Sequence, residues 1–478
     1  MKKKFITVVT FGVCIEILSV LILSIGDIKE KIPLFALLYT SSFLVYVFSV
    51  FYVLKNFVTP DTEETSSRRL VFWSILVFAF IFRFTLFPMT PSDDVFRYLW
   101  EGRLQLHGIN PYLYPPGSPE LEYLRDNFFE GINHKHLTTI YPPLTLIVFA
   151  IADYVSHSVL SLKAIFLVFD LLSIVLLAKF LKRMRRAPEH VLIYAWSPLI
   201  LMSFAGRGHC DSLQIFFVML AIYLFSARKI ILSTVSIALA VMSKFVFVIV
   251  VPFLLPKHKL KYLALMLLLI ALLYIPYLSA GKGLFSTLFH FGTHYHFNDS
   301  VHFLILCITG GSSVISKVVI LAIFSLVMLY LCISAKGNLK QDEYMIPSGS
   351  FQQSNRVEYC PGGLYHGGEA LRFAFLSIGT LILLAPTVHP WYLTWIVPFL
   401  CFYHSKAWIL FTGSIVFYYL MNHALFSTLI EHNNEWVWRE VHWLKLPEYV
   451  PFYCLLLYEL LKYPRIGKIV CPEPLKGK

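Results

Sequence analysis

The segment "MKKKFITVVTFGVCIEILSVLILSI", Met1 to Ile25, joins a basic start to an apolar run that is long enough to cross a lipid bilayer. No small-residue cleavage site follows it, so we expect an uncleaved first membrane helix rather than a removed signal peptide. Similar apolar runs recur along all 478 residues, of which 57% are hydrophobic and 14% charged, with a mean hydropathy of +0.68. Soluble domains carry about 25% charged residues. The sequence therefore predicts an all-α fold, a polytopic transmembrane helical bundle of about 11–14 membrane segments in one integral membrane domain.

The apolar segments predict the path of the chain across the membrane. Long segments cover residues 5–25, 33–54, 70–87, 159–181, 190–205, 212–227, 262–279, 313–335, 371–387 and 449–464. Shorter or interrupted segments cover residues 141–157, 230–255, 391–403 and 407–421. With the N-terminus inside, three crossings make residues 88–140 a large extracytoplasmic loop, and the polar stretch 336–370 is expected to be a cytoplasmic loop.

Basic clusters constrain this path further, because basic residues concentrate in cytoplasmic loops. Arg68 and Arg69 fall inside as this rule prefers, and the clusters at 182–186, 228–229 and 257–261 should lie on the same side.

Two consequences follow for the middle of the chain. Segment 230–255 must be a hairpin with Lys244 at its outer tip, and 141–157 and 159–181 cannot both cross fully. We interpret 141–157 as a half-buried helix, because it is short and begins with "YPP". Full crossings by both would instead place the 182–186 cluster outside.

Several kinds of function are disfavoured by the composition. The net charge of +12 comes from short clusters between apolar runs, which does not indicate nucleic-acid binding. The eight cysteines form no CxxC pair, so neither a disulfide framework nor a zinc site is predicted. His290 and His294 have the spacing of metal ligands on a helix, but the glycine between them argues against a helix there. No metal site is therefore predicted, and the sequence requires no divalent metal.

Two adjacent carboxylates, Asp93 and Asp94, begin the stretch "SDDVFRYLWEGRLQL". Its pattern predicts an amphipathic helix on the membrane surface, with Arg97 one turn from both Asp93 and Glu101. An N-cap followed by acids in the first helical turn would explain one carboxylate well and two less well. We therefore expect at least one of them to be catalytic.

Further polar residues interrupt apolar runs and should lie on the same side of the membrane as the acidic pair. "FAGRGHCDSLQ" offers Arg207, His209 and Asp211, although it could be only a polar interhelical loop. Lys244 could extend to the interface, or it could pair with an anionic ligand such as a lipid phosphate. His389 stands between prolines and aromatic residues in "APTVHPWYLTW". The convergence of these groups predicts a site. "EWVWREVHW" is expected to be an aromatic belt.

The order of these motifs resembles the polytopic GT-C glycosyltransferases. "SDDVFRYLWEGRLQLHGINPY", "YPPL", "GRGHCDSL", "SKFVFVIVVPF", "YHFNDSV" and "HPWYLTWIVPF" are most similar to those of bacterial polyprenyl-phosphomannose-dependent mannosyltransferases, over residues 70–400. GPI mannosyltransferases are more distantly similar. Cys210 stands where the resemblance leads us to expect Asn.

The resemblance implies an inverting transfer of a hexose, with mannose implied by the resemblance alone, from a polyprenyl-phosphate sugar to a lipid-linked or cell-envelope glycan. The active site would face outward from the cytoplasmic membrane. Asp93 or Asp94 would act as general base, and the donor would be bound by Arg97, Arg103, Arg207, His209, Asp211, Lys244 and His389. No nucleotide-binding glycine motif is present, which fits a lipid donor.

Two other functions have to be weighed. A lipid or glycolipid transporter or flippase predicts internal repeats with broken helices, and no convincing repeat is found. Another lipid-linked glycan enzyme, such as a ligase or polymerase, would share the topology without these motifs.

Overall fold

The computed structural model describes residues 2–58, 66–255, 260–343, 362–432 and 435–462. The first half of the chain forms α1 (Lys2–Ser24), α2 (Ile32–Asn56), α3 (Ser66–Leu86), α4 (Asp93–Leu106), η1 (Pro119–Leu124), η2 (Phe129–Gly131), α5 (Pro143–Val155), α6 (Val159–Arg183), η3 (Pro188–Val191), α7 (Leu192–Ala195), α8 (Pro198–Leu201), η4 (Met202–Gly206), α9 (Asp211–Ser226) and α10 (Ile230–Ser243). The second half forms η5 (Phe245–Val250), α11 (Val251–Leu254), α12 (Leu260–Tyr274), η6 (Ile275–Phe285), α13 (Ser286–His294), α14 (Val301–Ile308), α15 (Ser313–Glu343), α16 (Gly362–Leu384), η7 (Pro390–Trp395), α17 (Val397–Tyr403), α18 (Lys406–Ser414), α19 (Phe417–Leu420), β1 (Leu429–His432), β2 (Glu435–Trp438), η8 (His442–Leu444) and α20 (Lys445–Lys462).

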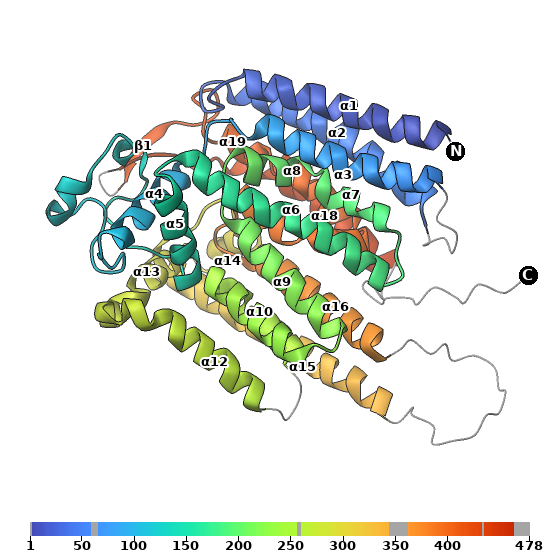
Figure 1. Ribbon diagram of the computed structural model, residues 1–478. Coiled ribbons are helices and arrows are strands. Elements are labelled where there is room, and N and C mark those ends of the chain that lie inside the picture. Colours follow the sequence, from blue (N-terminus) through green and yellow to red (C-terminus); the bar gives the residue numbers. More distant parts are fainter. Residues whose placement is uncertain (1, 59–65, 256–259, 344–361, 433–434, 463–478) are drawn as a thin grey trace, which may run out of the picture.

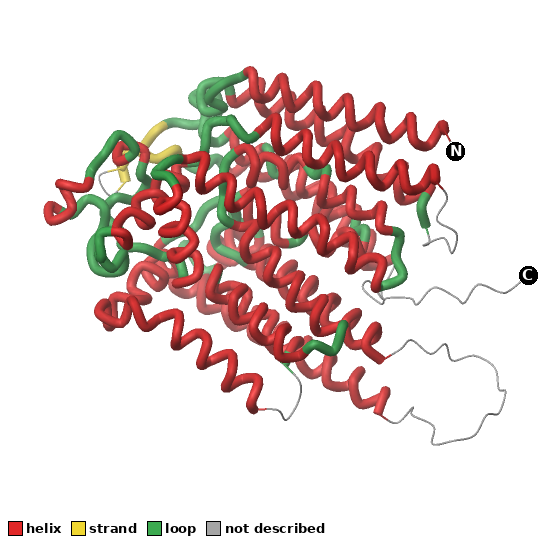
Figure 2. Tube along the Cα trace, in the orientation of Figure 1, coloured by secondary structure: helices red, strands yellow, loops and turns green. Residues whose placement is uncertain are grey.

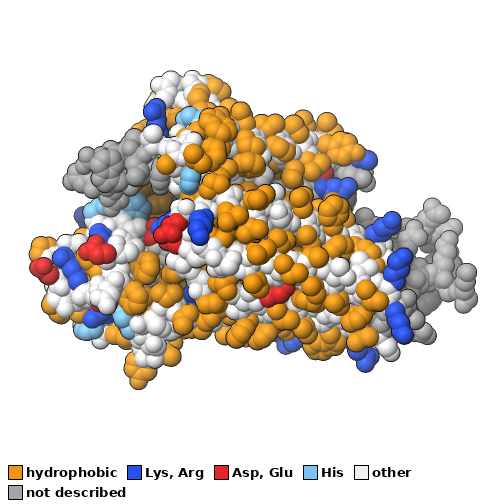
Figure 3. Space-filling view, turned by 90° about the horizontal axis from the view of Figure 1, so that it is seen from above, with side chains coloured by type: hydrophobic (Ala, Val, Ile, Leu, Met, Phe, Trp, Pro, Cys, Tyr) orange, Lys and Arg blue, Asp and Glu red, His pale blue; other side chains and the backbone are white. Residues whose placement is uncertain are grey.

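The long helices lie side by side, and most irregular segments gather at one end of the bundle, around α4, α5 and β1 (Figures 1 and 2). Among the described residues, seven helices are long and apolar enough to cross a membrane: Lys2–Ser24, Ile32–Asn56, Arg68–Leu86, Val159–Arg183, Leu260–His294, Ser313–Ala335 and Gly367–Leu384. Apolar side chains cover the middle of the face shown in Figure 3, and charged side chains lie toward its two ends. The predicted all-α polytopic fold is confirmed.

The basic clusters meet at the end of the bundle where the N-terminus lies. The Lys4 ammonium group and the Arg68 guanidinium lie 5.3 and 5.7 Å from the centre of the Phe57 ring. Arg68 also pairs with Glu189 at 2.7 Å, and Arg183 donates to the carbonyl of Ser226 at 2.6 Å. The loops after α2, α6 and α9 therefore share one side, as predicted. Lys257 and Lys259 lie outside the described residues.

The predicted hairpin is present, because α10 ends at Lys244 and the chain turns back through η5 and α11. The helix α5 has 13 residues, against 25 in α6, so of the two only α6 is long enough to cross a membrane. The apolar segment 190–205 forms several short helices rather than one long one, because Pro188 and Pro198 each begin a new helix there.

The predicted polar stretch 336–370 lies between the candidate membrane spans Ser313–Ala335 and Gly367–Leu384. Helix α15 continues to Glu343 and α16 begins at Gly362, so both sides of that stretch are helical, and the residues between them lie outside the described part. A short antiparallel hairpin of β1 and β2, with Ile430 paired to Val437, was not predicted. It occupies part of the expected aromatic belt.

Helix α4 packs closely against α5. A Cβ atom at Gly102 would lie 2.6 Å from the carbonyl oxygen of Phe149, so only glycine allows the two helices to approach this closely. The rings of Tyr98 and Phe149 stack at 4.5 Å. The predicted surface helix is instead largely enclosed, because Glu101, on its expected polar face, is 2% exposed.

Candidate active site

A cavity of about 790 Å³ lies beside the N-terminal end of α4. Its polar and charged lining residues are Lys29, Ser92, Asp93, Asp94, Arg97, Asn133, His134, Thr138, Arg207, His209, Asp211, Lys244, Thr287, Thr387, His389 and Asn422. Every predicted site residue except Arg103 is among them. The structure thus brings residues from separate motifs together around one cavity.

The acidic pair is presented by the start of α4. Ser92 is the N-cap, and its hydroxyl accepts a hydrogen bond from the backbone N–H of Asp94 at 3.4 Å. Both carboxylates occupy the first turn, where the helix dipole favours negative charge. The backbone N–H of Ser92 donates to the carbonyl of Arg207 at 2.8 Å, which fixes the helix start against the loop before α9.

Asp94 is held by two neighbours. Its Oδ1 accepts a hydrogen bond from the Asn133 amide at 2.8 Å, and its Oδ2 lies 3.4 Å from His209 Nδ1. Burial alone would raise the pKa of Asp94. The contact with His209, the Asn133 hydrogen bond and the nearby His389 outweigh burial and lower this pKa below its usual range. Asp94 is therefore a carboxylate at neutral pH.

Asp93 is the less constrained carboxylate. Within the described part of the chain, the only hydrogen bond to its side chain comes from the Ser92 hydroxyl, at 3.1 Å. Both side chains line the cavity, but Asp94 already uses both oxygens in contacts with protein groups. Asp93 thus has more lone-pair capacity left for an entering hydroxyl group.

Stacked rings form one wall of the cavity. Trp391 lies between two histidines, with ring centres 4.0 Å from His209 and 4.5 Å from His389. His389 Nδ1 hydrogen-bonds with the Tyr418 hydroxyl at 2.8 Å. Burial is the main cause that lowers the pKa of His389 to about 3, so its imidazole is neutral at physiological pH. His389 could therefore contact a donor through a hydrogen bond from its neutral ring rather than as a cation.

Lys244 supplies a cation at the tip of the hairpin. Its ammonium group lies 2.6 Å from Asp211 Oδ1 and 4.8 Å from the ring centres of both Tyr392 and Trp395. Burial would lower the pKa of Lys244, but Asp211 and Tyr392 raise it above its usual value, so the side chain stays charged.

Asp211 contacts Lys244 and two further side chains. Its Oδ1 also accepts hydrogen bonds from Trp395 Nε1 and Gln214 Nε2, both at 2.7 Å. The residue is 1% exposed. Asp211 therefore orients Lys244, and its Oδ1 is fully used by protein groups.

Arg207 and Gly208 form the turn before α9. Arg207 is 6% exposed, lines the cavity and donates to the carbonyl of Thr90 at 3.1 Å. Gly208 has φ +76°, a conformation that disfavours side chains, and a Cβ atom there would lie 3.0 Å from both Lys163 and Val95. The following Cys210 is buried, and burial raises the pKa of its thiol to about 12, so it remains neutral.

Arg97 is part of the scaffold. Its guanidinium donates to Glu101 at 2.9 Å and to four backbone carbonyls at 2.6–3.2 Å, those of Asn133, His134, Leu137 and Thr138. These contacts use all five of its N–H groups. Arg97 thus holds the loop that carries Asn133, and through it Asp94.

Arg103 does not line the cavity. It pairs with Asp126, which lies between η1 and η2, and Asp126 also contacts His157 at 2.6 Å. The structure does not place Arg103 at the predicted donor site. Its guanidinium lies against Asp126, and the residue is in the last turn of α4, whereas the two acids are in the first turn.

Apolar and aromatic side chains complete the cavity. They include Ile28 and Ile32 at the start of α2, Phe245 and Val246 after Lys244, Leu288 and Phe291 of α13, and Leu381, Ile382 and Ala385 of α16. A chamber that combines a few charged groups with a long apolar lining suits a molecule with an anionic head and a hydrocarbon tail.

No group of three or more His, Cys, Asp or Glu side chains that could hold a metal ion occurs among the described residues. The expectation that the glycine would prevent a helix around His290 and His294 is wrong, since both lie on α13, with ring centres 4.3 Å apart.

Several cavity residues could not be predicted from the sequence. Asn133 lies in an irregular loop, and Tyr418 lies in a short helix far along the chain. Trp391 and Tyr392 belong to the sequence motif that contains His389. The sequence therefore identified the motif but not the contacts of these two side chains.

The family description "Alpha-(1->6)-mannopyranosyltransferase, N-terminal domain", of the MptA_B family, matches residues 16–257. The chain belongs to this mannosyltransferase family. The matched region contains the acidic pair, the loop with Arg207 to Asp211, and Lys244. No curated protein and no solved structure matches the chain. The cavity is therefore the candidate active site of a membrane mannosyltransferase.

Proposed function

We propose that this mannosyltransferase takes mannose from a polyprenyl-phosphate donor and transfers it to a hydroxyl group of a lipid-linked or cell-envelope glycan. The observation that supports this proposal best is the composition of the cavity lining, which combines a carboxylate pair, the Lys244 cation and many apolar side chains. The phosphate requires the cation, the acceptor hydroxyl requires the carboxylate, and the polyprenyl chain requires the apolar surface.

In the proposed reaction, Asp93 accepts the proton of the acceptor hydroxyl while that oxygen attacks C1 of the mannose. The bond between C1 and the phosphate oxygen breaks, and its electron pair leaves with the polyprenyl phosphate. Lys244 and Arg207 stabilise the charge that develops on this leaving group. If the Tyr418 hydroxyl donates to Nδ1 of His389, the imidazole proton is on Nε2 and can be donated to a phosphate oxygen. No step of this proposal needs a divalent metal.

The carboxylates favour inversion at C1. A retaining mechanism needs a carboxylate nucleophile in addition to the acid or base. Among the described residues that line the cavity, the carboxylates are Asp93, Asp94 and Asp211. Asp94 shares the turn of Asp93, and Asp211 is occupied by Lys244. If the product is α-(1→6)-linked, as the family description indicates for the family, inversion requires a β-linked donor.

We further propose that the site faces outward from the cytoplasmic membrane. The cavity lies at the α4 end, whereas the basic clusters lie at the opposite end, which the positive-inside rule assigns to the cytoplasm. A lipid donor also fits this side, since it remains in the membrane at the point of use.

The test supplies purified enzyme with labelled mannose, either as polyprenyl-phosphate mannose or as a nucleotide sugar, together with a lipid-linked glycan fraction. We expect transfer from the lipid donor only. Transfer from the nucleotide sugar, or transport of the lipid without transfer, would contradict the proposal. Sealed vesicles of known orientation would show on which face the product forms.

A further inference from the structure

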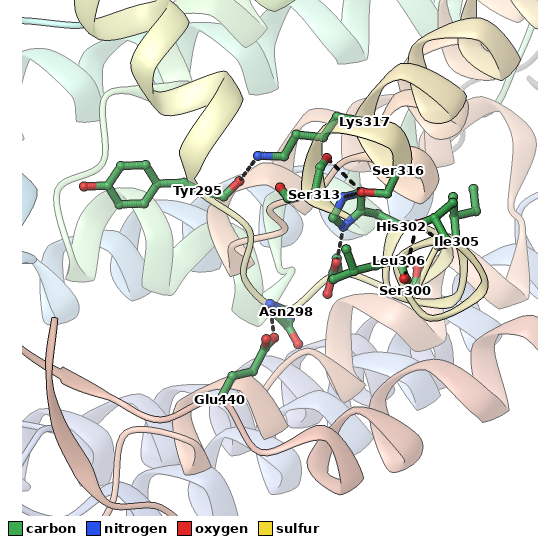
Figure 4. A network of polar contacts seen from close by, with 12 residues as sticks. Tyr295, Asn298, Ser300, His302, Ile305, Leu306, Ser313, Ser316, Lys317 and Glu440 are labelled. Atoms are coloured by element: carbon green, nitrogen blue, oxygen red, sulfur yellow. Dashed lines mark hydrogen bonds and ion pairs between the residues drawn. The ribbon is translucent and has the colours of Figure 1, made fainter. Parts of the chain in front are cut away.

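A second buried polar cluster lies behind the histidine of the cavity wall, in a part of the chain beyond the family match. Its centre is the turn between α13 and α14, which carries Asn298 and Asp299, 0% and 1% exposed. Figure 4 shows this turn, with Asn298 directed toward Glu440 and Lys317 reaching the carbonyl of Tyr295. Because these polar groups are buried away from water, they have to form hydrogen bonds with one another.

The turn pairs directly with the chain that leads into His389. The N–H of Phe297 donates to the carbonyl of Pro386 at 2.9 Å, and the N–H of Val388 donates to the carbonyl of Phe297 at 3.0 Å. The Phe297 ring also lies 5.5 Å from the Tyr418 ring, whose hydroxyl contacts His389. Phe297 therefore lies immediately behind the imidazole.

Asn298 joins this pairing to the C-terminal helix. Its side-chain amide donates to the carbonyl of Val388 at 3.2 Å and to Glu448 Oε1 of α20 at 2.8 Å. The carbonyl of Val388 belongs to the peptide group that continues into His389. The backbone carbonyl of Asn298 also accepts a hydrogen bond from the Tyr449 hydroxyl at 2.6 Å. One side chain thus connects the His389 peptide to α20.

The conformation of Asn298 fits this role. Its φ is +52°, in the left-handed region that asparagine tolerates better than most residues with a side chain. Glycine would tolerate this backbone as well but would lack the amide. The conformation alone therefore does not explain why an amide side chain occupies this position.

Ion pairs hold the rest of the turn. Lys445, at the start of α20, lies 2.6 Å from Asp299 and 2.8 Å from Glu440. Glu440 in turn accepts the backbone N–H of Asn298 at 2.6 Å. On the other side, Asp299 contacts His302, whose Nε2 lies 3.1 Å from the Ser316 hydroxyl of α15. The turn is clamped between α15 and α20.

We propose that Asn298 is a positioning residue: together with Glu448 it fixes the Val388–His389 peptide, and so sets the orientation of the imidazole toward the leaving phosphate. This assignment rests on the proposed function of the cavity. By this assignment α20 helps to position an active-site residue, although α20 supplies no cavity-lining residue among those described.

The test is a double-mutant cycle with Asn298→Gly and His389→Gln. Asn298→Gly keeps the left-handed backbone and removes only the amide contacts. We expect Asn298→Gly to lower kcat/KM about tenfold and His389→Gln about a hundredfold, with the double variant no worse than His389→Gln alone. Independent effects would multiply to about a thousandfold and would overturn the assignment.

Two variants control for general damage. Ser316→Ala breaks a hydrogen bond of the same cluster without touching Val388, and it should change kcat/KM less than about twofold. Glu448→Gln keeps the Oε1 acceptor and should retain activity, whereas Glu448→Ala should reproduce the effect of Asn298→Gly. If Asn298→Gly does not fold, Glu448→Ala takes its place in the cycle.

The outcomes separate this inference from the proposed function. If His389→Gln lowers transfer but Asn298→Gly and Glu448→Ala do not, the positioning role is wrong and the proposed function stands. If His389→Gln itself leaves donor use unchanged, the donor site is wrongly placed and the positioning role fails with it.

Discussion

Replacing Lys244 by glutamine perturbs the cavity at its best-defined ion pair. The ammonium group lies 2.6 Å from Asp211 Oδ1, and the Asp211 side chain is 2% exposed. After the substitution, that buried carboxylate keeps its hydrogen bonds from Trp395 and Gln214. Within the described part of the chain, it loses the one cation that pairs with it. Two separate losses should follow, one in stability and one in donor binding.

The size of each loss can be set from the structure. Breaking a fully buried ion pair costs about 3–5 kcal/mol. The Lys244 side chain is 24% exposed, and two neutral donors remain on Asp211, so we expect about 1–3 kcal/mol of destabilisation. A charge-assisted contact to phosphate contributes about 1.5–3 kcal/mol, which corresponds to a ten- to hundredfold loss of donor affinity.

The double variant Lys244→Gln/Asp211→Asn separates these two effects. It removes both charges, so most of the stability should return, whereas donor affinity should stay low. Lys244→Arg keeps a cation and should retain part of both. The assay combines thermal unfolding of the purified protein in detergent with donor titration of the transfer reaction.

Two results would refute this reasoning. Donor titrations of Lys244→Gln that overlay those of the parent protein would show that Lys244 contacts no phosphate and serves only Asp211. Recovery of donor affinity in the double variant would show that the uncompensated Asp211 charge, rather than the missing cation, had weakened binding.

Three further predictions concern the scaffold, the pH dependence and the stereochemistry. Arg97 has five acceptors, Glu101 and four loop carbonyls, and a lysine has only three N–H donors. Arg97→Lys therefore leaves at least two of these five acceptors unpaired, at about 1–3 kcal/mol each, so it should lower the thermal midpoint and reduce transfer. A midpoint equal to that of the parent protein would contradict the scaffold role. The pKa of His389 is lowered to about 3 in the folded protein, whereas it is about 6.5 in the unfolded chain. As the pH falls below about 6.5, the unfolded state therefore binds a proton before the folded state does. The contribution of His389 to stability should therefore fall progressively from about pH 6.5 down to about pH 3, and His389→Gln should make that fall smaller; an unchanged fall would argue against this cause. The enzyme should use the β-anomer of the lipid donor and form an α-linked product. NMR of the product measures the anomeric configuration, and a β-linked product from the β-linked donor would contradict the inverting mechanism.

The sequence was sufficient to predict the class of fold and the convergence of the site. Apolar segment lengths and basic clusters placed the acidic pair, Arg207 and Lys244 on one side, because these signals are local and the bilayer imposes the rest. The i,i+4 spacing likewise predicted the Arg97–Glu101 pair, observed at 2.9 Å.

The partners that define each role could not be predicted. Arg97 was assigned to the donor, but its N–H groups bind loop carbonyls 36–41 residues away, a distance over which no periodic pattern operates. The contact between Asn298 and Glu448 spans 150 residues. Such contacts depend on tertiary packing, which a single sequence does not encode in any local spacing.

The sequence identified the acidic pair but not the separate roles of its two carboxylates. Asp93 and Asp94 have the same side chain and adjacent positions in one helical turn. Only the fold brings Asn133 and His209 to Asp94 and leaves Asp93 open to the cavity.

The most direct measurement of the central claim is the rate of mannose transfer from polyprenyl-phosphate mannose by Asp93→Asn, at saturating donor and with its thermal midpoint recorded. We predict a midpoint near that of the parent protein and a kcat lowered about a hundredfold or more, since the base is lost while donor contacts remain. Asp94→Asn should lose less, because its carboxylate orients neighbours rather than accepting the proton. Full turnover in folded Asp93→Asn would contradict the assignment of the general base and, with it, the proposed mechanism.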